Sequence, residues 1–363
     1  MALQVGIVGL PLVGKTTIFN ALTAAGAEAT AYSKATTKPN VGIAKVPDER
    51  LKIIEKFIPT ERILPATIQV VDVAGLAKGA STGQGLGNKF LAHIRDMDAI
   101  LHVVRCFESD EVAHSEGSID PVRDIDLVET ELILADLEQV STSLDKATRA
   151  ARGGEKEAVA RAEVLEKAFK VLNDGRPVRE LELNSEQKKL IKSMGMITAK
   201  KTLFVANVGE GETADSERIK QMKERAAAEN APVVVLSGKL EAEIAELSEA
   251  DRGEMLAGMG LKEPALAVLA REAYRMLGLH SFLTAGPKEI RAWTIPIGAT
   301  APQAAGAIHT DFERGFIRAN IYALADLQQY KTETAIKAAG KMRAEGKDYV
   351  MKDGDITHFL FNV

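Results

Sequence analysis

A short glycine-containing motif near the start of the chain restricts the fold more than any other feature. Residues 5–8 are β-branched apart from one glycine and predict a buried strand, and residues 9–16 then have the pattern Gly-x-x-x-x-Gly-Lys-Thr. Residues 17–22 begin an amphipathic pattern typical of a helix. Strand, turn and helix thus occur in the order of a phosphate-binding loop, whose backbone N–H groups face anionic oxygens. We therefore predict a nucleotide site in an α/β fold.

Individual residues of this loop have separate expected roles. Lys15 would neutralise the β- and γ-phosphates, and the Thr16 hydroxyl would bind Mg²⁺. The alternative is a glycine-rich strand-to-helix turn without a ligand, and the strand context makes it the weaker one. The nucleotide-binding residues expected here are Leu12, Val13, Gly14, Lys15, Thr16 and Thr17.

Two later segments carry residue types that nucleotide switches use. Residues 32–40 are polar and contain a proline, which predicts a loop, and Thr36 stands where switches place a second Mg²⁺ ligand. A hydroxyl that only faces water is the alternative for Thr36. Residues 66–72 predict another buried strand, and Asp72 at its end can hold a Mg²⁺-bound water. The Gly75 amide just beyond can reach the γ-phosphate.

The group that would orient the attacking water is not evident from the motifs. Many GTP hydrolases have a glutamine where this chain has Leu76, and a leucine side chain has neither donor nor acceptor. Residues 107–117 are a polar loop that follows a predicted strand, and they contain one histidine, His114. His114 is the candidate for the catalytic role, and a solvated loop histidine is the alternative.

The composition is that of an ordinary globular protein, with 46% apolar and 27% charged residues among 363. This length allows two or three domains. The chain has no run of about 18 apolar residues and begins with the phosphate-loop strand rather than a signal peptide, so we expect a cytoplasmic protein without a membrane partner. We also expect a monomer that does not bind DNA. The single Cys106 excludes an internal disulfide and a thiolate metal cluster.

The α/β pattern is interrupted once and then returns. From residue 125 the β-branched runs give way to charged helix formers with leucines at heptad-like spacing, which predicts a helical hairpin. Strand patterns resume near residue 202, and a separate unit begins at Gly278, with helices expected at residues 303–308 and 333–345. We predict an α/β domain in two parts, a helical insertion and a C-terminal domain, with the boundaries 1–124 and 200–277 for the α/β domain, 125–199 for the insertion and 278–363 for the C-terminal domain.

The two strands after the insertion end in polar residues, at the edge where an open parallel sheet binds its ligand. We predict that the base is bound there by Asn207, Val208, Glu210, Ser237 and Gly238. Guanine-specific sites use Asn-Lys-x-Asp, whose carboxylate accepts from the guanine N1–H and 2-amino groups. In Asn-Val-Gly-Glu the lysine stem is lost and the carboxylate is one methylene longer. We therefore expect ATP to bind at least as tightly as GTP.

Taken in order, these motifs resemble the Obg-like ATPase family, YchF type. The resemblance rests on the phosphate loop Gly-Leu-Pro-Leu-Val-Gly-Lys-Thr, on Asp-Val-Ala-Gly-Leu at residues 72–76, on Asn-Val-Gly-Glu at residues 207–210 and on Arg-Ala-Trp-Thr-Ile-Pro at residues 291–296. It covers essentially the whole chain. It implies a doubly wound P-loop NTPase domain interrupted by an α-helical coiled-coil hairpin and followed by a TGS domain, a small β-grasp module.

The resemblance also implies a function and places residues. It implies a Mg²⁺-dependent protein that binds ATP in preference or in addition to GTP, hydrolyses it slowly and associates with ribosomes. It puts Mg²⁺ on Thr16 and Thr36, makes Leu76 a hallmark of the family and matches His114 to a loop histidine that is thought to help hydrolysis. Leu12 replaces the family's usual asparagine, which leaves the monovalent-cation requirement open. A conventional GTPase, or a nucleotide-stabilised ribosome or RNA scaffold, remains an alternative.

Overall fold

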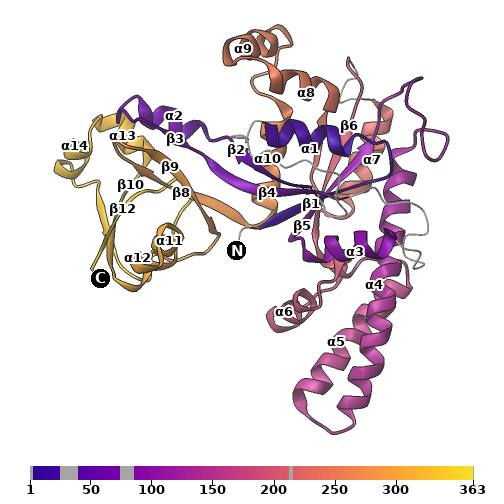
Figure 1. Cartoon of the computed structure of the whole chain (residues 1–363). Helices are drawn as coiled ribbons and strands as arrows, with labels where there is room; N and C mark the ends of the chain where they lie inside the picture. The colour runs from indigo at the N-terminus through magenta and orange to yellow at the C-terminus, as the bar shows by residue number, and fades with distance from the viewer. Residues whose placement is uncertain (1–2, 25–39, 74–85, 212–215, 363) are drawn as a thin grey trace. The chain divides into compact units, whose positions relative to one another are not determined.

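Figure 1 shows the computed structural model of the chain, in which residues 3–24, 40–73, 86–211 and 216–362 are described. The chain forms two compact units, which are residues 1–43 with 69–269 and residues 44–68 with 270–363. The sequence predicts residues 44–68 as part of the first segment of the α/β domain. In the structure they join the C-terminal unit, because a strand within them pairs with a strand of that unit.

A six-stranded sheet in the order β2-β4-β1-β5-β6-β7 forms the centre of the first unit. The phosphate-loop strand β1 pairs in parallel with β4 on one side and with β5 on the other, so the strand order reverses at β1, as a doubly wound sheet requires. Every residue of β5 is buried, which explains its uninterrupted apolar pattern. The strands are β1 (Gln4–Val8), β2 (Asn40–Val46), β4 (Ala66–Asp72), β5 (Ala99–Arg105), β6 (Lys201–Asn207) and β7 (Val233–Leu236).

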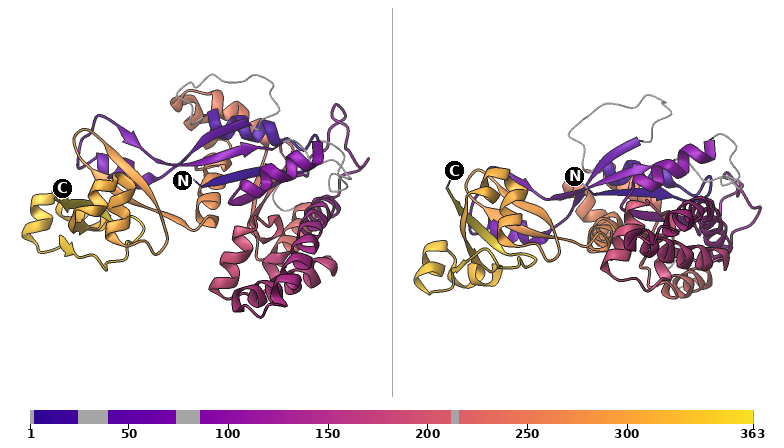
Figure 2. Two further views of the ribbon diagram at one scale, coloured as in Figure 1. Left: turned by 60° about the horizontal axis from the view of Figure 1, so that its bottom comes forward. Right: turned by 90° about the horizontal axis from the view of Figure 1, so that it is seen from below.

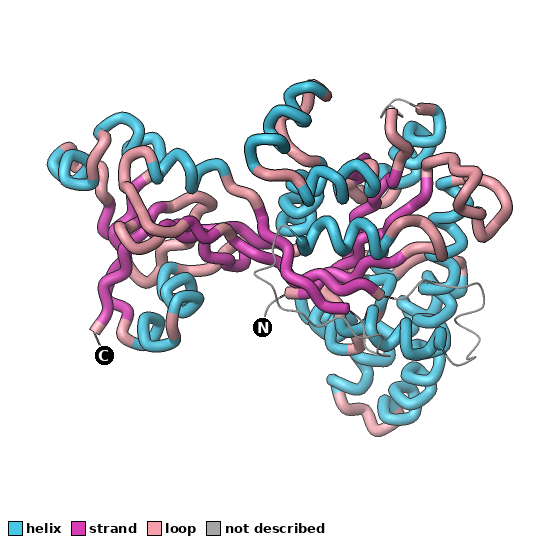
Figure 3. Tube along the Cα trace, turned by 45° about the horizontal axis from the view of Figure 1, so that its top comes forward, coloured by secondary structure: helices cyan, strands magenta, loops and turns pink. Residues whose placement is uncertain are grey.

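Helices flank this sheet (Figure 3). The helix that follows the phosphate loop, α1 (Lys15–Ala24), packs against α8 (Gly238–Glu246), which begins at the second predicted base-binding segment. Two helices distant in sequence are thus brought together behind the predicted site. The other helices that belong to the sheet or follow it are α3 (Leu86–Asp96), α7 (Glu217–Ala227), α9 (Glu249–Gly258) and α10 (Ala265–Met276).

A helical hairpin is inserted between β5 and β6. Its first helix, α4 (Pro121–Ala151), begins with proline at the first position and with an Asp120 side chain that accepts from the Arg123 N–H, both standard N-terminal signals. It lies alongside α5 (Lys156–Asn173), as Figure 2 shows. Buried apolar side chains between the two helices include Val140, Leu165 and Leu172. The short elements η2 (Val178–Glu180), α6 (Ser185–Ser193) and η3 (Ile197–Ala199) lead back to the sheet.

A second six-stranded sheet, in the order β11-β10-β12-β8-β9-β3, builds the C-terminal unit. Antiparallel pairs β8–β9 and β10–β12 are joined by a parallel contact between β12 and β8, an arrangement that fits the expected β-grasp fold. The strands are β3 (Ile63–Leu64), β8 (Leu279–Ala285), β9 (Ile290–Pro296), β10 (Phe316–Tyr322), β11 (Arg343–Glu345) and β12 (Ile356–Phe361).

Besides the second half of α10, the helices described in this unit are α2 (Glu49–Glu55), α11 (Ala301–Ile308), α12 (Thr310–Arg314), α13 (Leu324–Tyr330) and α14 (Glu333–Ala338). The expected helix over residues 333–345 is wrong in its second half. The helix α14 ends at Ala338, and Gly340 then has a φ of 69°, a left-handed conformation that stops a helix. The chain continues as the edge strand β11 instead.

The described helices include none that is both long enough and apolar enough to cross a membrane.

Candidate nucleotide site

The phosphate loop occupies residues 9–14, between the buried strand β1 and the start of α1. Its two glycines are required by space as well as by conformation. A Cβ on Gly9 would lie 2.3 Å from the Val103 carbonyl oxygen, and one on Gly14 would lie 2.3 Å from Asn207 Nδ2; the φ angles are 150° and 94°. Any side chain at either position would push the loop away from the strands that support it.

Lys15 is nearly buried, with 8% of its surface exposed. Its ammonium group donates to the Gly9 carbonyl at 3.1 Å and to the Leu10 carbonyl at 2.7 Å. Burial lowers the pKa of Lys15 from 10.5 to about 8, although the charge of Asp72 opposes that shift. A desolvated ammonium group held by two neutral carbonyls has much to gain from phosphate oxygens placed over the same loop.

Thr16 and Asp72 meet at the edge of the sheet. The Thr16 hydroxyl donates to Asp72 Oδ2 at 2.9 Å, and Asp72 comes from the carboxyl end of β4, beside β1. Hydroxyl and carboxylate oxygens are the ligands that Mg²⁺ prefers, and Mg²⁺ characteristically takes only one or two protein ligands together with phosphates and waters. The donor set therefore fits Mg²⁺. Thr36 and Gly75, the other two groups predicted on this side, lie outside the described residues.

Asn207 ties the phosphate loop to the base side. It is 5% exposed, its Nδ2 donates to the Val13 carbonyl at 2.9 Å, and its Oδ1 accepts from the Gly238 N–H at 2.8 Å. The two strand ends and the loop are thereby held in a fixed arrangement. Both polar atoms of the side chain already have a protein partner. Asn207 therefore holds the phosphate loop and the start of α8 together, a structural role that the sequence did not indicate.

The remaining base-side residues differ in exposure. Val208 is 7% exposed and packs in an apolar cluster with residues of α7, while Ser237 caps α8 by accepting from the Leu240 N–H at 3.5 Å. Glu210 is half exposed and forms an ion pair of 2.9 Å with Lys239. This pair raises the pKa of Lys239 above its ordinary value. Lys239 was not predicted; its position directly after Ser-Gly at the second strand end was the only signal.

His114 does not project into solvent. Its side chain is 6% exposed, its Nε2 lies 3.0 Å from Asp124 Oδ2, and its Nδ1 accepts from the Glu116 N–H at 3.1 Å. Because Nδ1 is an acceptor here, the ring proton is on Nε2 and is donated to the carboxylate. The alternative of a solvated histidine therefore does not hold for the described conformation, in which His114 is attached to the first turns of α4.

Arg105 shapes the loop that carries His114. It ends β5, is 2% exposed and donates to the main-chain carbonyls of Phe107, Val112 and Ala113 at 2.9 to 3.1 Å. Burial lowers its pKa, although the nearby charge of Asp124 opposes that shift. A buried guanidinium that satisfies three carbonyls fixes the path of residues 107–113. An arginine at the end of an apolar strand is the one sign of this role in the sequence.

Comparisons with known proteins match both units. Residues 279–362 match the C-terminal YchF-GTPase family, described as "Protein of unknown function (DUF933)", and residues 4–139 match the family described as "50S ribosome-binding GTPase". The proteins named ribosome-binding ATPase YchF from Escherichia coli O157:H7 and from Bacillus subtilis (strain 168) are 48% identical over 363 residues and 47% identical over 366, in each case over 100% of both chains.

Solved structures give the same result. The structure of the Schizosaccharomyces pombe YchF GTPase is 35% identical in sequence, has a TM-score of 0.87 and covers 99% of this chain and 98% of that chain. A GTP binding protein from Pyrococcus horikoshii OT3 is 20% identical with a TM-score of 0.62, covers 99% of this chain and 100% of its own, and shares the fold. The expected fold class is therefore confirmed.

Proposed function

The chain belongs to the YchF family of P-loop nucleotide hydrolases, and from this premise we propose that it is a slow, Mg²⁺-dependent ATPase that associates with the ribosome. The observation that carries the proposal is the group of Lys15, Thr16 and Asp72 at one edge of the sheet. It provides a cation for phosphate oxygens and two oxygen groups for a metal, all positioned by buried strands.

These residues have distinct roles in the proposed reaction. The Lys15 ammonium, which donates to loop carbonyls in this structure, would bind the β- and γ-phosphate oxygens. Thr16 and Asp72, together with Thr36, would hold Mg²⁺ directly or through water. Bound Mg²⁺ would supply positive charge to the phosphate oxygens. The Gly75 amide would donate to the γ-phosphate. Leu12, Val13, Gly14 and Thr17 would contribute main-chain groups from the loop and the helix N-terminus.

His114 is the proposed water-positioning group, since Leu76 has no polar atom to do this. In the described conformation both ring nitrogens are engaged by Asp124 and Glu116. Hydrolysis would therefore require the imidazole to leave at least one of these partners. A step that depends on releasing a buried histidine agrees with slow turnover.

The base side supports ATP as the substrate, with GTP weaker or comparable. A guanine-specific carboxylate must have both oxygens available to the N1–H and 2-amino groups, whereas one Glu210 oxygen is paired with Lys239. Val208 stands where guanine-specific sites have a lysine whose stem packs over the base, and its own side chain is buried away from the base. We propose that Asn207, Val208, Glu210, Ser237 and Gly238 contact the base with no strong guanine preference.

Ribosome association is proposed because the relatives are named ribosome-binding ATPases, and the helical hairpin adds support. The end of the hairpin has five exposed cationic side chains that could meet phosphates, at Lys146, Arg149, Arg152, Lys156 and Arg161. We propose that residues 125–199 and 278–363 make partner contacts. Residues 1–124, apart from the segment 44–68 that joins the C-terminal unit, and residues 200–277 would bind the nucleotide. We further propose that the protein works as a cytoplasmic monomer.

The experiment that tests the proposal measures affinity and turnover for ATP and GTP, with and without ribosomes, together with ribosome co-sedimentation. We expect ATP to bind at least as tightly as GTP and the protein to sediment with ribosomes. GTP bound a hundredfold more tightly than ATP would favour the conventional GTPase. Ribosome binding that responds to nucleotide without any turnover would favour the scaffold.

A further inference from the structure

The first turns of α4 present two sets of carboxylates to different parts of the nucleotide domain. Asp124 faces the loop of residues 107–117, while Asp126 and Glu129 face α7. The same helix continues for 31 residues as one arm of the inserted hairpin, a length of about 46 Å. The helix that carries the insertion therefore also contacts the loop that carries His114.

The buried Asp124 carboxylate binds the loop that carries His114. The carboxylate side chain is 3% exposed, one oxygen accepts from His114 Nε2 at 3.0 Å, and the other accepts from the Arg123 guanidinium at 2.8 Å. The ring is held from its other side by the Glu116 N–H. An imidazole with both nitrogens bonded and 6% of its side chain exposed cannot also orient a water on a phosphate.

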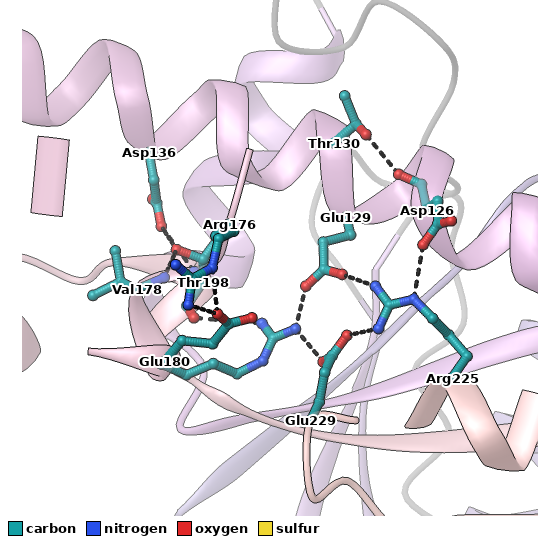
Figure 4. A network of polar contacts seen from close by, with 11 residues as sticks. Asp126, Glu129, Thr130, Asp136, Arg176, Val178, Glu180, Thr198, Arg225 and Glu229 are labelled. Atoms are coloured by element: carbon teal, nitrogen blue, oxygen red, sulfur yellow. Dashed lines mark hydrogen bonds and ion pairs between the residues drawn. The ribbon is translucent and has the colours of Figure 1, made fainter. Parts of the chain in front are cut away.

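Residues around the His114–Asp124 pair hold both partners in place. Arg105 fixes residues 107–113 through three main-chain carbonyls, so the loop cannot slide along the sheet edge. On the α4 side, Figure 4 shows Glu129 and Glu229 both paired with Arg225, which anchors α4 to α7. The same two carboxylates also pair with Arg179. Asp126 also pairs with Arg225 at 2.9 Å, but its side chain is 55% exposed, so water and salt weaken this pair and it adds little to the anchoring. The carboxylate of Asp124 is thus held at a fixed place.

We propose that Asp124 is a positioning residue that holds His114 withdrawn, so that the inserted hairpin restrains nucleotide hydrolysis through the root of α4. The inference rests on the proposed role of His114 in hydrolysis. A shift of α4 caused by a partner on the hairpin would move Asp124 away from the loop and free the imidazole. The restraint uses a hydrogen bond to a charged group, and losing such a bond shifts a two-state equilibrium by about tenfold or more.

The test is a double-mutant cycle on the full chain without ribosomes. We expect Asp124→Ala to raise ATP turnover about tenfold at saturating ATP with little change in KM. The same substitution in a His114→Ala background should have no effect, because Asp124 acts only through His114. Asp124→Asn retains an acceptor of the same size and should give a smaller rise.

The matched control is Asp126→Ala, which removes a carboxylate from the same turn of α4 without touching His114. It should leave ATP turnover unchanged. Amide hydrogen exchange provides a measurement that does not depend on hydrolysis: the Glu116 amide, which donates to His114 Nδ1, should exchange faster in Asp124→Ala and Asp124→Asn but not in Asp126→Ala.

Three results would overturn the inference. Asp124→Ala and Asp124→Asn could both lower turnover, which would make the carboxylate an activating partner. The substitution could have the same effect with and without His114, which would place its action elsewhere. Glu116 exchange could be the same in all variants, which would mean that Asp124 does not hold the loop. If the wild-type chain hydrolyses no nucleotide, the proposed function fails, and hydrogen exchange still decides whether the contact restrains His114.

Discussion

The two halves of the nucleotide site are built in opposite ways. On the phosphate side Lys15 is 8% exposed and donates to two main-chain carbonyls of the phosphate loop. On the base side Lys239 is a lysine with 75% of its side chain exposed, paired with a Glu210 side chain that is 51% exposed. Asn207, which bonds both the phosphate loop and α8, lies where the two halves meet.

This difference predicts how well each half of the site tolerates substitutions. The phosphate side depends on glycines without room for a Cβ and on a desolvated charge, so most changes there damage binding or folding. The base side also contains buried residues, but its Glu210 and Lys239 are exposed side chains whose interaction is weakened by water and salt. Substitutions of these two residues can change base preference at little cost to the fold. The following predictions test this contrast.

The largest expected effect is on turnover. Lys15→Ala should reduce ATP hydrolysis at least about a hundredfold, because it removes the cation aimed at the phosphates. The matched substitution on the base side, Lys239→Ala, should reduce turnover by less than about tenfold. Steady-state phosphate release measures both, and circular dichroism checks that each variant is folded. Retained turnover in folded Lys15→Ala protein would refute the assignment of the phosphate loop.

Stability should show the same contrast for glycines. Gly14→Ala should cost about 3 kcal/mol, because its Cβ would lie 2.3 Å from Asn207 Nδ2 at a φ of 94°. Gly211, beside Glu210, has a φ of 84° but no described atom within 4 Å of its ideal Cβ. Gly211→Ala should therefore cost only about 1 kcal/mol. Urea unfolding measures both, and equal costs would show that the loop has room to relax.

The depressed pKa of Lys15 predicts a dependence of stability on pH. The folded-state pKa is about 8 and that of the unfolded chain about 10.5, so between these values the unfolded chain holds more protons. The free energy of unfolding should therefore rise as the pH rises from about 8 to about 10.5, by up to about 3 kcal/mol in total. Urea unfolding of the wild type at several pH values should show this gain relative to Lys15→Met.

Base preference should respond to a smaller change. Glu210→Asp shortens the carboxylate, weakens its contact with Lys239 and restores the residue type of guanine-specific sites. We expect the affinity ratio of GTP to ATP to rise by about threefold to tenfold, as measured by calorimetry. Glu210→Gln keeps the length without the charge and should not favour GTP. Adding the lysine of guanine-specific sites at position 208 would place a charge in an apolar cluster, because Val208 is buried there.

The smallest effect concerns Leu12. Its φ is 63°, a left-handed conformation that is costly for leucine, and 58% of its surface is exposed, so little packing offsets the strain. Leu12→Asn should stabilise the nucleotide-free protein by about 1 kcal/mol, since asparagine tolerates this conformation. Urea unfolding measures the gain. A loss of stability would show that the exposed leucine side chain has contacts worth more than the strain.

Some properties followed directly from the order of residues. The phosphate loop, the buried strands and the inserted hairpin are encoded by local patterns: fixed glycine spacing, β-branched runs, and leucines at helical intervals after a proline and an N-cap. The fold class and the family could therefore be predicted from the sequence. The sequence also predicted that Asp72 lies near Lys15 and Thr16, because the ends of neighbouring parallel strands meet at one edge of a sheet.

Other properties depend on contacts between distant segments, which no local pattern records. Residues 44–68 join the C-terminal unit because Ile63 and Leu64 pair with residues more than two hundred positions away. The bonds of Asn207 to Val13 and Gly238, the pair of Glu210 with Lys239 and the attachment of His114 to Asp124 also require the folded chain. Sequence thus determined which chemical groups are present and near which strand ends, while tertiary structure decided which partner each group binds, because burial and hydrogen bonding are set by packing between elements.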